Sequence, residues 1–135
     1  MAIETAVVAP VLAMMIVGTF EVSSMIARQV ELQSAASEAE AIALAAKPDT
    51  AAKLATLKNV IMTSTGLSAA HVTVTNKYRC SDAAVLVTTD TACGSGVAVW
   101  TYVDMGLTTT YTPTWTHWGF GQPVDYNVRR QVMIS

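Results

Sequence analysis

The sequence predicts an α+β protein with a long N-terminal helix, a short second helix and a C-terminal antiparallel sheet of about four strands. Three observations indicate this class. Residues 2–46 favour helix almost without interruption, residues 50–62 repeat apolar side chains at helical spacing, and from residue 71 onward apolar and polar residues alternate. We expect an N-terminal helix at 1–46 and a globular head at 47–135.

The first helix is expected to span residues 2–46, because only Pro10 and Gly18 oppose helix within it and Pro48 stops it. At 1.5 Å per residue it would be about 65 Å long, which is more than a small domain can cover. A helix that projects so far needs another structure to cover it.

The two halves of this helix differ in chemistry. Residues 5–20 are apolar all round, which is typical of a segment buried on every side in lipid or in a helical bundle. With residues 2 and 3 this run approaches the about 20 residues of a membrane span. After Glu21 the pattern becomes one-faced. The expected buried stripe consists of Val22, Met25, Ile26, Val30, Leu32, Ala36, Ala39, Ile42 and Leu44.

The second helix is expected from Thr50 to Met62, with Asp49 or Thr50 as its N-cap and Gly66 ending it. Its apolar stripe is formed by Leu54, Leu57, Val60 and Ile61.

Four runs after this helix read as strands. They cover residues 71–80, 82–89 (the weakest pattern), 97–104 and 124–135. In the last run, one face should carry Val124, Tyr126, Val128, Val132 and Ile134. Turn signals rich in glycine separate the runs.

Composition and motifs favour neither nucleic-acid binding nor catalysis. Charged residues make up only 13% of the 135 residues, the net charge is −2, and no basic stripe is present. No nucleophile motif, calcium loop or phosphate-binding loop occurs, and His71 and His117 are expected to be structural or surface residues. We therefore expect no enzyme activity, no metal and no cofactor.

The two cysteines, Cys80 and Cys93, lie 13 positions apart in a polar stretch without metal-ligand spacing. One interpretation is a pair of free buried thiols. The favoured one is a disulfide, which stabilises by about 3 kcal/mol in the chain-entropy model and indicates an oxidising compartment.

An aromatic cluster lies in the expected loop between the last two strands. Trp115, Trp118 and Phe120 either cover the sheet or the long helix, or form a contact surface for a neighbouring subunit or a ligand.

A single acid, Glu4, stands at the edge of the apolar run. A glutamate in a bilayer costs a few kcal/mol unless it finds a partner. The sequence therefore raises the question of what that partner is.

The N-terminal half resembles TadE-like proteins of tight-adherence (Tad) pilus systems, a branch of the type IV pilin superfamily. The matching features are the small-apolar-Glu start at residues 2–4, an apolar run with a proline, the Gly18-x-x-Glu21 step, and an Ala-rich helix after an arginine. A Thr/Val strand, "TYTPTW" and a closing strand with two arginines are a weaker C-terminal similarity.

The resemblance implies a prepilin cut by a prepilin peptidase, so that the chain is a mature form held in the inner membrane before assembly machinery moves it into a filament. Glu4 matches the family's glutamate, which in a staggered bundle can meet the free α-amino group of a neighbour's Met1 and set axial register. Pro10 permits a kink or local melting. Glu21 either pairs with Arg28 of an adjacent helix or is exposed to solvent.

These observations predict a non-enzymatic structural subunit of an extracellular Tad or type IV-like filament on a bacterial surface, built from identical chains and serving adhesion. Two alternatives remain open. The chain could be a minor pseudopilin that primes or tips a pilus, or a membrane-anchored binding domain that does not polymerise.

Overall fold

The computed structural model describes residues 2–81 and 83–135; Met1, Asp82 and the side chains of residues 2–4 lie outside the described part. Two α-helices precede a four-stranded antiparallel sheet, so the predicted α+β class is confirmed. In order, the elements are α1 (Ala2–Ala46), α2 (Ala51–Thr65), β1 (Val72–Cys80), β2 (Leu86–Val87), η1 (Asp90–Ala92), β3 (Val99–Tyr111), η2 (Thr114–Trp118) and β4 (Val124–Met133).

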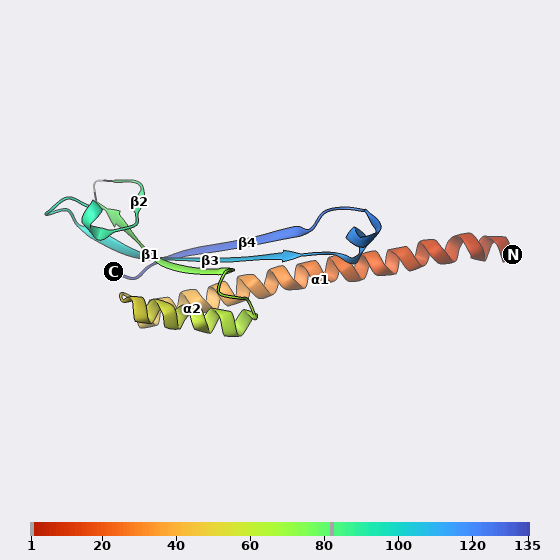
Figure 1. The fold of residues 1–135 in the computed structure, drawn as a ribbon, viewed down its shortest axis with the longest axis horizontal. Coiled ribbons are helices and arrows are strands. Elements are labelled where there is room, and N and C mark those ends of the chain that lie inside the picture. Colours follow the sequence, from red (N-terminus) through yellow and green to blue (C-terminus); the bar gives the residue numbers. More distant parts are fainter. Residues whose placement is uncertain (1, 82) are drawn as a thin grey trace.

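Helix α1 runs along most of the molecule, and the end of the head that carries β2 extends beyond it (Figure 1). Its N-terminal half projects beyond the head, while α2 and the sheet lie along its second half. The helix is continuous through Pro10 and ends at Ala46, where Lys47 takes a positive φ of 43° immediately before Pro48. The predicted extent of this helix is confirmed.

Helix α2 begins and ends at capping residues. The side chain of Thr50 accepts a hydrogen bond from the Lys53 backbone N–H at 3.5 Å, which satisfies a donor of the first turn. Gly66 ends the helix in the left-handed region with φ 67°, which favours glycine. The helix is therefore one turn longer than the predicted end at Met62.

The strands are ordered β2-β1-β3-β4 and all pair antiparallel. The weak pattern at 82–89 yields only the two-residue edge strand β2. Strand β3 is longer than predicted, because its Thr-rich end at 108–111 continues to pair with β4. Gly106 suits this pairing, since a Cβ there would come within 2.6 Å of the Thr73 hydroxyl oxygen.

The core lies between one face of the sheet and the two helices. The sheet contributes Val72, Val103, Met105, Leu107, Tyr126, Val132 and Ile134, and α2 contributes Leu57 and Ile61. Helix α1 contributes Leu32, Ala35, Ala36, Ala39 and Ala43. The inward face of β4 is therefore as predicted, and the head's core is incomplete without the second half of α1.

The predicted stripe on α1 is partly wrong. Leu32 is fully buried, but the other large aliphatic residues of the stripe are exposed, namely Val22, Ile26, Val30, Ile42 and Leu44, and on α2 Val60 is exposed as well. The head instead covers an alanine-rich face of α1, because alanines let the sheet and α2 approach the helix backbone closely. Apart from Leu32, the large aliphatic side chains of α1 are left on the surface.

Candidate functional site

The N-terminal half of α1 is a continuous exposed apolar surface. Its exposed large side chains are Val7, Val8, Val11, Leu12, Met14, Met15, Ile16, Val17 and Phe20. By length and composition, α1 is the one described helix long and apolar enough to cross a membrane, with a mean hydropathy of 1.9 in its most apolar part. An exposed apolar area of this size marks an interaction surface, with lipid or with other protein.

This apolar surface continues along α1 past residue 20. Val22 and Ile26 line a shallow groove together with Met15 and Gly18. An added Cβ at Gly18 would meet no atom within 4 Å, so the helix surface is open there. Small residues of this kind let a second helix approach closely.

The predicted register residues lie at the far end of this surface. Met1 and the side chain of Glu4 lie outside the described residues, although the backbone of residue 4 belongs to α1. Pro10 lies inside the helix, and because proline has no N–H, the carbonyl of Ala6 lacks its usual intrahelical donor.

Glu21 is a buried acid at the junction between the two halves of α1. Only 4% of its surface is exposed. One carboxylate oxygen accepts a hydrogen bond from the Tyr111 hydroxyl at 2.7 Å, and the other accepts from the Thr114 backbone N–H at 3.1 Å and from the Thr114 hydroxyl. The helix is thereby joined to the end of β3 and the start of η2.

The predicted solvent exposure of Glu21 is therefore wrong, because both of its oxygens bind groups of the same chain. Arg28 also has partners of its own: its guanidinium lies 2.7 Å from Glu31 and donates to the Thr65 carbonyl at 3.4 Å. Glu21 and Arg28 thus both have partners within their own chain, and neither needs a pair with the other in an adjacent helix.

The contact with Glu21 changes the pKa of Tyr111. Its pKa is raised above the ordinary tyrosine value, first because its hydroxyl donates to Glu21, and further by burial and by the negative charge. Nearby, the Tyr126 hydroxyl donates to the Met25 carbonyl at 3.0 Å. Two tyrosines from adjacent strands therefore fasten the sheet to α1.

Sequence reasoning missed this contact between Glu21, Tyr111 and Thr114. The partners lie 90 and 93 positions away from the glutamate. Tyr111 and Thr114 stand in a Thr-rich stretch whose composition is ordinary for a strand, so no local signal distinguished them.

The loop after Thr114 carries the predicted aromatic cluster. Trp115 is half-buried, and its indole lies against Gly121, where an added Cβ would be 3.0 Å from Nε1. Trp118 and Phe120 are 67% and 71% exposed. Of the two predicted roles, covering the protein applies in part to Trp115. The exposed rings of Trp118 and Phe120 are available to contact a partner.

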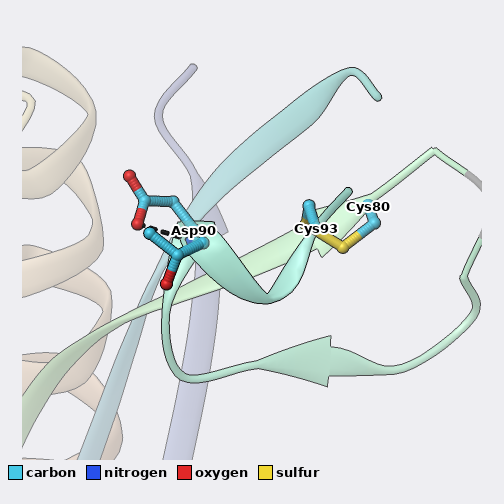
Figure 2. The surroundings of a disulfide bond; sticks show 4 residues. Cys80, Asp90 and Cys93 are labelled. Atoms are coloured by element: carbon cyan, nitrogen blue, oxygen red, sulfur yellow. Dashed lines mark hydrogen bonds between the residues drawn. A yellow bond between two sulfur atoms is a disulfide. The ribbon is translucent and has the colours of Figure 1, made fainter. Parts of the chain in front are cut away.

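The two cysteines are joined at the opposite end of the head. Figure 2 shows Cys80, at the end of β1, bonded to Cys93, which follows η1. Their Cα atoms are 5.5 Å apart, and both residues are buried. The disulfide closes the loop that carries β2 and η1 onto the sheet.

Within residues 2–81 and 83–135, no three His, Cys, Asp or Glu side chains lie close enough together to hold a metal ion. His71 and His117 are exposed; His71 lies in the turn before β1, and His117 lies in η2. The notable features of the described chain are therefore an apolar helix surface, a buried glutamate and an aromatic loop.

Comparison with known proteins gives one match. Residues 1–40 match the model of the TadE-like protein family. This confirms the resemblance over most of α1, including its exposed apolar half. Neither a curated protein nor a solved structure matches the chain.

Proposed function

We propose that this chain, whose residues 1–40 match the TadE-like family, is a structural subunit of an extracellular Tad-type pilus filament on a bacterial surface. One observation carries the proposal. The family match coincides with a helix whose large apolar side chains between Val7 and Phe20 are exposed, while its second half completes the core of a compact head. Such a chain suits a filament in which helices form the core and heads form the outside.

The apolar half of α1 has two successive environments in this proposal. Before assembly it lies in the inner membrane, where its side chains contact lipid, and after assembly it lies among the same segments of identical chains. The membrane and the filament core both remove these side chains from water. Burying each large apolar side chain contributes about 1.5–3 kcal/mol, so both environments stabilise the helix. The prepilin peptidase and the pilus assembly machinery are the partners that this route requires.

Glu4 sets the axial register between subunits. In a staggered bundle its carboxylate lies beside the α-amino group of a neighbouring chain, and the ion pair offsets the cost of burying either charge alone. Pro10 assists the transfer, because the missing backbone hydrogen bond lowers the cost of bending or locally unwinding the helix.

The test compares Glu4→Ala with Glu38→Ala, which removes an exposed glutamate further along the same helix. Fibres sheared from cells are quantified by immunoblotting and electron microscopy, and membrane fractions report the amount of unassembled chain. We expect Glu4→Ala to abolish or strongly reduce fibres while the membrane pool persists, and Glu38→Ala to assemble normally. Normal fibres from Glu4→Ala would exclude the register role.

A second candidate is a membrane-anchored binding domain that does not polymerise. The exposure of Trp118 and Phe120 favours it, because such rings suit a ligand as well as a neighbouring subunit. It predicts that the native chain stays in the membrane fraction and is absent from sheared fibres. A minor subunit at the tip of a pilus predicts only trace amounts there.

A further inference from the structure

The loop between β3 and β4 is uncharged and rich in aromatic residues. Residues 112–121 read TPTWTHWGFG and contain no Asp, Glu, Lys or Arg. Trp118 and Phe120 expose about two thirds or more of their surfaces, 67% and 71%. Two neighbouring rings of this size do not stay in water without cost, so the loop needs a partner.

Glu21 fixes where this loop lies along α1. The backbone N–H and the hydroxyl of Thr114, the first residue of η2, both donate to the Glu21 carboxylate. Glu21 immediately follows Phe20, the last residue of the all-apolar run, and Phe20 is itself 72% exposed. Figure 1 shows the loop at the end of the sheet nearest the projecting half of α1.

The length of the apolar run places this level at a membrane surface. Residues 5–20 span about 24 Å as a helix, and residues 2–20 together span about 28 Å, which is close to the hydrocarbon core of about 30 Å, so the run crosses only when its whole length from residue 2 is used. When it crosses, Phe20 and Glu21 lie at the headgroup boundary on the side of the head. Tryptophan is enriched at this boundary, where its ring is partly apolar and its N–H remains hydrated.

We propose that the loop at residues 114–121 is a membrane-interface contact of the unassembled chain, with Trp118 and Phe120 inserted between the headgroups of the leaflet beside the head. This inference rests on the membrane stage of the proposed function. The loop is held beside the last turn of a lipid-covered segment, so its rings continue the lipid-facing surface. The absence of acidic residues in it means that anionic headgroups do not repel it.

The contact gives the head a defined height and tilt above the bilayer. A single short helix leaves a head free to rotate about the helix end, whereas a second contact point restricts it. The hydrogen bonds to Thr114 transmit this restriction to α1, because they join the loop to the helix at its point of exit.

The test measures how deep individual tryptophans lie in phosphatidylcholine vesicles that contain the full chain. The chain has three tryptophans, so Trp100→Phe with Trp115→Phe leaves only Trp118. The matched control retains only Trp100, which is near the opposite end of β3, about 36 Å along the strand from Tyr111. A third variant carries Leu12→Trp in a chain whose native tryptophans are all phenylalanine, and reports on the middle of the apolar run.

Lipids brominated near the glycerol end or near the tip of the acyl chains quench tryptophan at the corresponding depth. We expect the shallow bromines to quench Trp118 severalfold more than Trp100, and the deep bromines to quench the tryptophan at position 12 most. If the doubly substituted chain does not fold, the native chain is compared with Trp118→Tyr instead. The decrease in quenching by the shallow bromines then measures the contribution of Trp118.

Other outcomes contradict the inference in distinguishable ways. Deep quenching at position 12 with Trp118 quenched no more than Trp100 overturns the loop contact and leaves the membrane stage intact. Blue-shifted Trp118 emission without bromine quenching indicates that protein, such as a second copy, covers the ring, and this also overturns it. No quenching at position 12 contradicts both the membrane stage and the loop contact.

Discussion

Glu21 and Thr114 are 93 positions apart in the chain, yet the glutamate accepts hydrogen bonds from both the backbone N–H and the hydroxyl of the threonine. This contact joins the point where α1 leaves its apolar half to the loop that follows β3. Together with the hydrogen bond from the Tyr126 hydroxyl to the Met25 carbonyl, it holds the sheet and the aromatic loop at a fixed level along the helix. The surfaces proposed to act in the membrane and in the filament are therefore joined at Glu21.

Replacement of Glu21 tests this contact. In Glu21→Ala the Thr114 N–H and the Tyr111 hydroxyl lose their acceptor, and a donor left unpaired away from water is destabilising. We expect a lower melting temperature of the head by circular dichroism and faster hydrogen exchange at residues 111–116. Glu38→Ala removes an exposed glutamate of the same helix and should change neither; an equal effect of the two substitutions would contradict the role of Glu21.

Tyr111 provides a prediction on pH. Its pKa is raised in the folded chain, mainly by the hydrogen bond to Glu21, so the folded chain keeps a proton that the unfolded chain loses in alkali. This stabilising contribution is complete below the ordinary tyrosine pKa of about 10 and declines as the pH rises through the raised pKa.

The measurement is a titration of tyrosine absorbance in the detergent-solubilised chain, which has four tyrosines. We expect Tyr111→Phe to remove the component that titrates latest, and Glu21→Gln to shift that component toward the ordinary range. The shift follows because glutamine replaces the charged acceptor of the Tyr111 hydrogen bond by a neutral one and also removes the negative charge. If the component that titrates at the highest pH is unchanged in both variants, it belongs to a tyrosine other than Tyr111.

The buried face of α1 gives a third prediction. Leu32 is fully buried and Val30 is 58% exposed, although both are aliphatic and lie two positions apart. Leu32→Ala should lower the free energy of unfolding by about 2–5 kcal/mol, because it leaves a cavity. Val30→Ala should change it by no more than about 0.5 kcal/mol. Denaturant unfolding measures the free energy of unfolding of both variants. A larger loss in Val30→Ala than in Leu32→Ala would indicate that the head packs on the opposite face of α1.

The disulfide gives a fourth prediction. Alkylation of the intact chain without reductant should leave its mass unchanged, and two added alkyl groups would refute the bond between Cys80 and Cys93. Replacing both cysteines by serine should destabilise the head by about 3 kcal/mol, because the bond restricts the unfolded chain. Helix α1 should keep its helicity, since the disulfide closes the loop that carries β2, and β2 lies at the end of the sheet far from the projecting half of α1 (Figure 1).

Much of the fold could be predicted from local patterns. The C-terminal end of α1 and the caps of α2 follow from Pro48, Thr50 and Gly66, whose backbone preferences act within a few residues. The faces of β4 follow from strict alternation. Strand β2 pairs with β1 at only two positions, at the edge of the sheet. The number of paired residues depends on the neighbouring strand, so it could not be predicted from the sequence of residues 82–89 alone.

The buried face of α1 and the partner of Glu21 could not be predicted in the same way. Helix α1 carries apolar residues on more than one face, and hydropathy alone favours burying the large ones such as Val22 and Ile26. The head buries alanines instead, because close approach of the sheet needs small side chains, and it leaves the large ones to other contacts. The glutamate's partners depend on long-range packing that local composition does not reveal.

The central claim is that the exposed half of α1 is covered by the same segment of identical chains. Cryo-electron microscopy of fibres sheared from cells tests it most directly. The account predicts fibres in which this chain is the dominant subunit, with residues 5–20 in a helical core and the head outside. Fibres that lack the chain, or that hold it with the apolar half of α1 exposed at the surface, would contradict it.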